Sequence, residues 1–306
     1  MTAPDDLVQP FQVESMAAQG RLVRLGRAID AILSAHSYPA PVAHLLGELM
    51  VVGAMLSGTL KRKGVLTIQA HGDDAIRLLV ADLTHDGKIR GYARFDEAAV
   101  AELTSGDDSM ESLPVPRLLG GGRLVFTLDH GGSQRPYQGI VPLEGGTLAE
   151  CAQAYFRQSV QSEAAFKITV GRGEDGWRAG GLMLQRLARK GYQLQSGDTD
   201  IVDIDEAWRR AVVLMGSCTN DELLSGALNP HDLLYRLFNE DGVRVFRTEA
   251  LRMECRCSRD RVQEVLGNFP KSEIAQMKIG DDVVVNCEFC NREYRFTPAD
   301  IDHIFA

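Results

Sequence analysis

The C-terminal part of the chain holds four cysteines in two close pairs, Cys255-x-Cys257 and Cys287-x-x-Cys290. Thiolates at this spacing are typical ligands of tetrahedral Zn²⁺. Two pairs are needed because each short loop can place only two sulfurs on one side of the metal. We therefore predict that these four residues bind one zinc ion per chain. The alternative is a set of inert buried cysteines, which rarely occur as two close pairs.

Four sulfur ligands would fill the coordination sphere of the ion, whereas catalytic zinc normally keeps one position open for water or substrate. Hydrolytic chemistry at this metal is therefore not expected, and we predict a protein that is not an enzyme. The nearest histidine, His303, could serve as a ligand only if a thiolate were lost.

The first pair differs from a plain zinc ribbon, which usually has Cys-x-x-Cys on both sides. A one-residue spacer binds metal but closes a small, strained disulfide ring, and strained disulfides tend to be labile or regulatory. Positive charge nearby would favour the thiolate, which both binds metal and attacks oxidants. Four arginines surround the pair, although a solvated surface explains any single one: Arg252, Arg256, Arg259 and Arg261. The pattern indicates a redox-responsive site.

Composition limits the partners of the chain. Its 306 residues are 44% hydrophobic and 25% charged, with a formal net charge of −9. An acidic chain is a poor nucleic-acid binder, because phosphates require a basic field. The N-terminus shows no export signal. The most apolar stretch, 42–60, contains His44 and Glu48 and lacks the ~20 apolar residues of a membrane span, so we predict a buried helix there. We expect a cytoplasmic protein without membrane contact.

Hydrophobic periodicity predicts an α+β fold, because strand patterns mix with helices without a βαβ rhythm. The N-terminal part is predicted to be mostly antiparallel sheet with packed helices. Expected helices span 21–35, 41–60 and 147–162, the last with a capping box formed by Thr147 and Glu150. Expected strands span 65–70, 76–83, 89–95, 124–129, 137–142, 166–170 and 177–184. We predict a core domain at 1–190, a helical linker at 191–250 and a small zinc-binding domain at 251–306, with 190–205 as a polar boundary.

The predicted linker contains three short helices, at 205–215, 221–225 and 230–238, followed by a strand at 243–246. Asn229 is the expected cap of the third helix. This segment is amphipathic and too small to bury both of its faces, so it should lie on a neighbouring surface.

Other motifs predict structural roles. Gly171 to Gly176 matches G-x-G-x-x-G, but a strand follows it where a dinucleotide site needs a helix, so we predict a hairpin turn and no nucleotide. Isolated Cys151 and Cys218 are expected to be buried structural residues. The aromatic residues beside the second cysteine pair could stack on bases, but a small core is the favoured role: Phe289, Tyr294 and Phe296.

The cysteine pattern, with Ser258-Arg259-Asp260-Arg261 after the first pair, resembles the redox-switch domain of the heat-shock protein 33 family. Three upstream segments are similar to further landmarks of that family, in the same order: 155–161 (YFRQSVQ), 179–185 (AGGLMLQ) and 233–238 (LLYRLF). The resemblance covers most of the chain.

This resemblance implies an ATP-independent holdase chaperone of the cytosol. In the family, the reduced form holds zinc through the four cysteines and is inactive. Oxidants such as peroxide or hypochlorous acid form two disulfides, here Cys255–Cys257 and Cys287–Cys290, and zinc leaves. The C-terminal domain then unfolds, the linker is destabilised, and unfolded client proteins bind, commonly to an oxidised homodimer. From the linker pattern we expect the client-binding side chains to include Leu223, Leu224, Leu233, Leu234, Leu237 and Phe238.

Two other classes of protein remain as alternatives. A zinc-ribbon nucleic-acid or transcription partner would need a basic patch and salt-sensitive binding. A thiol-disulfide oxidoreductase using Cys287-x-x-Cys290 would need a thioredoxin-like βαβ context.

Overall fold

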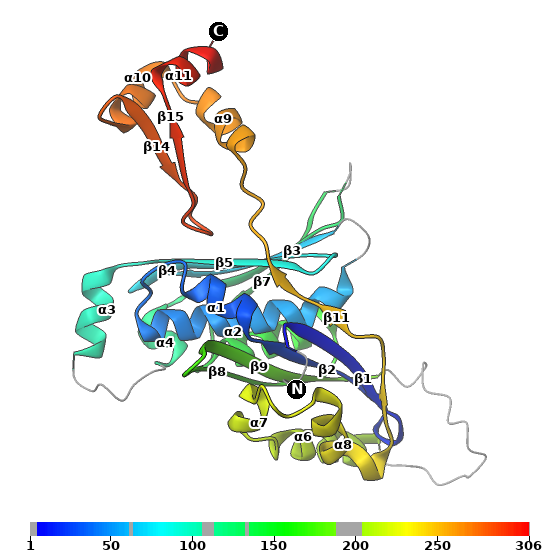
Figure 1. Ribbon diagram of the computed structural model, residues 1–306. Coiled ribbons are helices and arrows are strands. Elements are labelled where there is room, and N and C mark those ends of the chain that lie inside the picture. The colour runs from blue at the N-terminus through cyan, green and yellow to red at the C-terminus, as the bar shows by residue number, and fades with distance from the viewer. Residues whose placement is uncertain (1–4, 61–63, 106–112, 132–134, 188–203, 306) are drawn as a thin grey trace. The chain divides into compact units, whose positions relative to one another are not determined.

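The computed structural model describes residues 5–60, 64–105, 113–131, 135–187 and 204–305. The chain forms two compact units, residues 1–253 and 254–306. The first is an α+β unit in which helices lie between two sheets (Figure 1). Among the described residues, no helix combines the length and apolarity needed to cross a membrane.

The first sheet is antiparallel, with strand order β10-β1-β2-β9-β8, and β11 also pairs with β1. Its strands are β1 (Leu7–Val13), β2 (Ala18–Leu25), β8 (Ala164–Gly173), β9 (Gly176–Arg186), β10 (Val243–Val245) and β11 (Glu249–Ala250). In β9 every residue from Ala179 to Leu184 is buried. A strand loses its in-and-out alternation in this way when both faces of its sheet are covered.

The second sheet has the order β12-β5-β4-β3-β6-β7. Its strands are β3 (Val65–Gly72), β4 (Ile76–Thr84), β5 (Lys88–Phe95), β6 (Gly122–Asp129), β7 (Tyr137–Pro142) and β12 (Arg252–Met253). The first five form the antiparallel arrangement that short runs and tight turns predict, whereas β12 joins β5 in parallel.

The main core surrounds α2 (Ala40–Leu56), which contacts β4 and β5 of the second sheet and β2, β8 and β9 of the first. Nearly every residue of α2 is buried, which confirms the predicted buried helix. The other helices of this part are α1 (Arg27–Leu33), α3 (Glu97–Thr104), α4 (Val115–Leu118) and α5 (Leu148–Tyr155).

Three helices cover the face of the first sheet that is turned away from α2 (Figure 1). They are α6 (Ile204–Gly216), α7 (Asn220–Leu224) and α8 (Pro230–Phe238). Their apolar side chains form a second core with residues of β1, β2 and β9, and the ring of Phe238 stacks on Phe11 at 5.8 Å between centroids. The predicted linker therefore lies on a neighbour, and the side chain of Asn229 caps α8 as predicted.

The second unit is a small domain with a three-stranded antiparallel sheet of order β13-β14-β15. Its elements are α9 (Arg259–Gly267), α10 (Lys271–Ile274), β13 (Lys278–Ile279), β14 (Asp282–Asn286), β15 (Glu293–Phe296) and α11 (Pro298–Ile304).

Two helix predictions were wrong in part. Residues 21–25 belong to β2, and α1 begins only at Arg27, after Gly26. The apolar spacing suggested one long helix because a strand buried on both faces gives no alternation to distinguish it. The helix expected over 147–162 is α-helical only to Tyr155 and continues as a π-helical turn to Val160.

The capping box predicted at the start of α5 is only half formed. Thr147 accepts the Glu150 N–H, but the Glu150 carboxylate accepts from Gly146 N–H instead. The strand at 7–13 had not been predicted, and the polar boundary at 190–205 lies mostly outside the described residues.

A carboxyl group inside the main core makes stability depend on pH. Glu48 on α2 is 8% exposed, and burial raises its pKa from 4.5 to about 7. A hydrogen bond that its carboxylate accepts from Leu148 N–H acts to lower the pKa but is the weaker effect. Between these two pH values the native protein keeps a proton that the unfolded chain has released. The free energy of unfolding therefore falls as pH rises through this range.

We predict that Glu48→Gln removes this pH-dependent loss. The variant should gain on the order of 3 kcal/mol over the parent chain between pH 4.5 and 7, because glutamine keeps the acceptor without the charge. Urea unfolding at a series of pH values measures the difference. The exposed Glu97→Gln is the matched control, and a stability difference that stayed constant with pH would contradict the prediction.

Candidate metal centre

The four predicted ligands meet in the second unit. The sulfur atoms of Cys255, Cys257, Cys287 and Cys290 all lie within 4.8 Å of one another. The Sγ of Cys255 is 3.6 Å from that of Cys287, and the Sγ of Cys257 is 3.5 Å from that of Cys290. Zn–S bonds of ~2.3 Å in a tetrahedron place sulfurs about 3.8 Å apart. The donor set therefore fits a tetrahedral thiolate-bound metal ion, and all four are free cysteines.

The second pair sits in the turn between β14 and β15. Cys287 N–H donates to Arg292 O at 3.0 Å, and Asn291 N–H donates to Cys287 O at 2.8 Å. Asn291 takes the left-handed conformation, with φ of 54°, which asparagine tolerates better than most residues. This tight turn holds both sulfurs on one side. The strand-turn-strand context lacks the helix that a thioredoxin-like motif would place there.

The first pair enters from β12, which ends two residues before Cys255. Ser258 then caps α9 by accepting the N–H of Arg261. The side chain of Arg259 donates to Arg295 O, pairs with Asp300 at 3.0 Å and lies 4.3 Å from the centroid of the Phe296 ring. This arginine therefore ties α9 to β15 and α11.

Ionisation of the thiols is strongly coupled in this cluster. Burial acts to raise the pKa of Cys257, but hydrogen bonds from Tyr294 and the other cysteines bring it down to about 7. Burial raises the pKa of Cys290 to about 12 and also raises that of Cys287. Because neighbouring like charges oppose one another, four sulfurs this close cannot all be thiolates without a cation between them. A divalent cation would supply the positive charge that this donor set needs.

Sequence reasoning missed the interactions of Tyr294 and Arg292 with the cysteine cluster. Tyr294 is buried, and its hydroxyl donates to Cys257 Sγ at 3.1 Å. A hydrogen bond to Tyr294 raises the pKa of Arg292, with further contributions from Cys257 and Cys290. The only pattern in the sequence that pointed to either contact is the position of both residues just after the second pair.

The aromatic residues divide between two environments. Tyr294 and Phe296 are buried in the small core of the second unit with Leu266, Ile274 and Val283, so they are not available to stack on bases. Phe289 is only half-buried. His303 is exposed on α11 and is not a member of the sulfur cluster.

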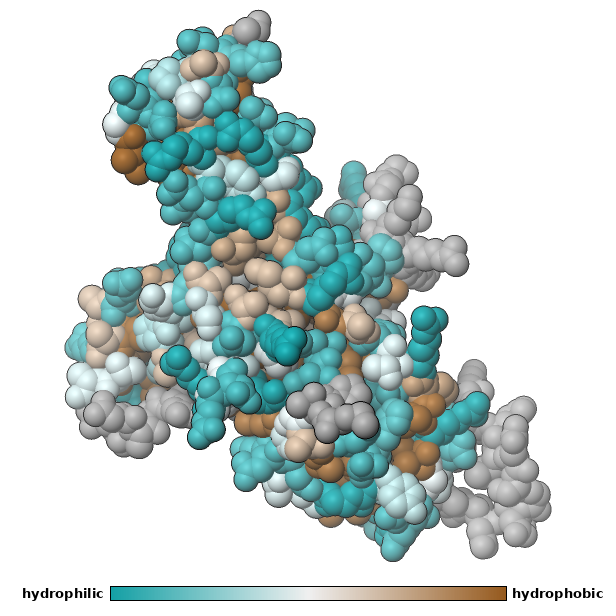
Figure 2. All heavy atoms as spheres, viewed as in Figure 1, coloured by the Kyte–Doolittle hydropathy of each residue, from teal (hydrophilic) through white to brown (hydrophobic). Residues whose placement is uncertain are grey.

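The other predicted residues lie in the first unit. Cys151 and Cys218 are both buried, as expected. The glycine-rich segment forms the β8–β9 hairpin, with Gly173 opposite Gly176, which confirms the predicted turn. The apolar linker side chains are buried against the first sheet, except that Leu224 is half-exposed: Leu223, Leu233, Leu234, Leu237 and Phe238. The outer surface of the linker helices, at the bottom of Figure 2, is a mixture of hydrophilic and apolar residues.

Comparison with known proteins agrees with the cysteine pattern. A family model described as Hsp33 protein matches residues 6–297. The chain belongs to the Hsp33 family. A curated Hsp33 relative named 33 kDa chaperonin, from Caulobacter vibrioides, is 41% identical over 299 residues, covering 96% of this chain and 95% of the relative. Another of the same name, from Pseudomonas fluorescens, is 35% identical over 306 residues, covering 99% and 95%.

A solved Hsp33 structure has the same fold. The crystal structure of the 33 kDa chaperonin, an Hsp33 homolog from Thermotoga maritima, superposes with a TM-score of 0.80 at 22% identity and covers 98% of both chains. The α+β architecture of this chain is therefore that of Hsp33.

The Tyr294 contact gives a test of the metal centre. We predict that Tyr294→Phe weakens zinc binding about tenfold, because a lost hydrogen bond to a ligand typically costs ~10-fold or more in metal affinity. Competition with a chromophoric chelator measures the affinity. Tyr235→Phe, which changes an exposed linker tyrosine, is the control and should bind zinc like the parent chain. Unchanged affinity in Tyr294→Phe would remove the assigned role of this hydrogen bond.

Proposed function

We propose that this protein is an ATP-independent holdase chaperone that is inactive when reduced and active when oxidised. The observation that carries the proposal is the cluster of four free cysteine sulfurs within 4.8 Å, in a chain that belongs to the Hsp33 family. Residues 1–190 would form the core domain, 191–250 the linker and 251–306 the redox-switch domain. Cys255, Cys257, Cys287 and Cys290 would hold one zinc ion, which supplies positive charge and cross-links a domain whose own core is small.

Oxidation would proceed at the two cysteine pairs. Each pair of thiolates gives two electrons to one peroxide molecule and forms one S–S bond. The O–O bond of the peroxide breaks, and its two oxygens take up two protons from solvent and leave as two water molecules. Two peroxides thus convert four thiolates into the disulfides Cys255–Cys257 and Cys287–Cys290. No thiolate then remains to bind the metal, and residues 251–306 lose the cross-link that stabilises them.

Unfolding of the switch domain would reach the linker through the chain itself. The segment that leads into Cys255 is held along the first unit by the pairing of the short strands β10 and β11 with β1 and of β12 with β5, and by three further main-chain hydrogen bonds. Phe246 N–H donates to Pro10 O, Leu251 N–H to Asp6 O and Arg252 N–H to Gly87 O. Strands of only two or three residues have low local stability. Their loss would release the C-terminal end of α8.

Linker release would uncover two apolar surfaces at once. One is the buried stripe of the linker, and the other is the face of β1, β2 and β9 beneath it. Together they would bind unfolded client proteins and prevent their aggregation. We propose that this happens in the cytoplasm, where thiols are normally reduced, and that the oxidised form is a homodimer without need of nucleotide or nucleic acid.

Two buried cysteines outside the metal cluster provide internal reporters. Cys218 lies in the interface between the linker and the first sheet, whereas Cys151 lies in the main core. We predict that peroxide releases zinc, makes Cys218 reactive to an alkylating reagent and leaves Cys151 protected. In the same samples, thermal aggregation of an unrelated protein should be suppressed. Chelator absorbance, peptide mass spectrometry and light scattering measure the three effects.

The outcomes of this experiment separate the alternatives. If the reduced, zinc-bound form prevents aggregation as well as the oxidised form, the switch is wrong. Protection of Cys218 after zinc loss would rule out linker release. Salt-sensitive DNA binding would favour the zinc-ribbon alternative, and catalysis of insulin reduction would favour the oxidoreductase.

A glycine in β9 offers a way to open the linker without oxidation. The main chain of α7 lies directly on Gly180, where an added Cβ would meet Leu223 O at 2.7 Å. Since a carbonyl of the main chain cannot turn aside as a flexible side chain can, we predict that Gly180→Ala displaces the linker. The reduced, zinc-bound variant should alkylate at Cys218 at least several-fold faster and suppress aggregation without peroxide.

Gly173→Ala in the same hairpin is the matched control, because an added Cβ there meets nothing within 4 Å. It should behave like the parent chain. Equal Cys218 reactivity in both variants would show that the linker tolerates the added methyl group and that this contact does not hold it closed.

A further inference from the structure

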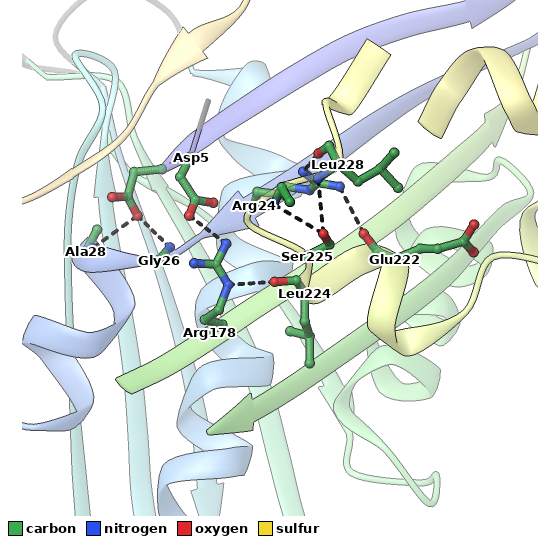
Figure 3. Close-up of polar contacts among 11 residues, drawn as sticks. Asp5, Arg24, Gly26, Ala28, Arg178, Glu222, Leu224, Ser225 and Leu228 are labelled. Carbon is green, nitrogen blue, oxygen red and sulfur yellow. Dashed lines mark hydrogen bonds and ion pairs between the residues drawn. The ribbon is translucent and has the colours of Figure 1, made fainter. Parts of the chain in front are cut away.

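Two arginines of the first sheet extend to the main chain of the linker (Figure 3). Arg24 on β2 donates through Nη2 to Glu222 O at 2.9 Å and through Nη1 to Leu228 O. Arg178 on β9 donates through Nε to Leu224 O at 2.6 Å. All three acceptors are carbonyl groups from α7 and the loop that follows it. These hydrogen bonds of the two guanidinium groups therefore hold the main chain of the segment and do not involve its side chains.

Arg24 is an unusual residue to bury here. It is 1% exposed, and burial lowers its pKa. Among the described residues, the charge of Asp5 favours the charged form of Arg24 without an ion pair between them, and the Nε of Arg24 lacks a hydrogen-bond partner. Arg178, in contrast, pairs with Asp5 at 2.6 Å. A buried charge satisfied mainly by neutral carbonyls costs stability relative to an apolar side chain, so a purely structural role accounts poorly for it.

The arginines lie within the apolar surface that the linker covers. On β2, Leu22 is two residues from Arg24 and therefore on the same face of the strand. On β9, Leu182 and Leu184 are four and six residues from Arg178, and these even spacings place them on the face of Arg178. These three leucines belong to the second core, which the linker helices complete. The uncovered surface would thus combine apolar area with charged donors that are spaced along two adjacent strands.

We propose that Arg24 and Arg178 form a site for main-chain carbonyl groups, occupied by residues 222–228 in the reduced protein and by an unfolded client chain once the linker has left. This inference rests on the proposed function. An unfolded chain presents the same carbonyl groups as the linker, whatever its side chains are. Donors of this kind would bind many clients without selecting a sequence, while the leucines bind apolar side chains.

The test uses the full-length, peroxide-oxidised, zinc-free protein and reduced, carboxamidomethylated α-lactalbumin, a probe that stays unfolded in native buffer. Arg24→Met and Arg178→Met should each weaken probe binding about tenfold, because a hydrogen bond from a charged donor is worth roughly that factor. Arg94→Met removes an exposed arginine from β5 of the other sheet and should bind the probe like the parent chain. Fluorescence anisotropy of the labelled probe measures the dissociation constants.

A second form of the probe, with its carboxyl groups amidated, identifies the acceptor. The tenfold loss should persist with this probe if main-chain carbonyls are bound. A loss seen only with unmodified probe would assign the arginines to carboxylates and overturn the proposal. Equal affinity of all variants for both probes would also overturn it, since the arginines would then act only on the linker.

The controls separate this inference from the proposed function. If the oxidised parent chain does not bind the probe, the proposed function fails. If it binds and the variants bind equally well, only the present inference fails. Circular dichroism before oxidation checks that each variant is folded. Should Arg24→Met not fold, Arg178→Met, whose side chain is partly exposed, still decides the question.

Discussion

The contact between the linker helices and the outer face of the first sheet is the constraint on which the rest of the molecule depends. It makes β9 a strand buried on both faces and lets α7 lie on a glycine. The apolar stripe around Phe238 cannot be exposed in water without a free-energy cost of ~1.5–3 kcal/mol for each large side chain. In the proposed function this surface is covered in the reduced protein and available to clients in the oxidised protein, so the contact that covers it must be reversible.

In the proposed function, the four cysteines of the candidate metal centre control whether the linker stays on the sheet. Four sulfurs within 4.8 Å of one another would repel as thiolates unless a bound cation neutralised them. Under this proposal, oxidation would remove the negative charge of the sulfurs and their ability to bind the cation at the same time. The folding of this domain, whose apolar core is small, would then depend on the redox state of the four sulfur atoms.

Much of this could be predicted from the sequence. The two cysteine pairs, the α+β class, the buried helix around Glu48 and most strands of the second sheet follow from local spacing and periodicity. The amphipathic pattern of the linker also predicted that it must lie on a neighbour. The first strand escaped prediction because Gln9, Pro10 and Gln12 interrupt its apolar residues, and the start of β2 because Leu22 and Leu25 have a helical spacing that continues into α1.

Only the tertiary structure decided which groups meet. The Tyr294 hydroxyl reaches Cys257 across 37 residues of sequence, and Arg24 reaches Glu222 across 198. Such contacts depend on strand pairing and packing between distant segments, which leave no periodic trace in the chain. The sequence by itself determined the chemistry of the ligands and the amphipathicity of the linker. The fold determined which face of the sheet the linker covers and placed the hydrogen-bond donors Arg24 and Arg178 beneath it, because both depend on long-range packing.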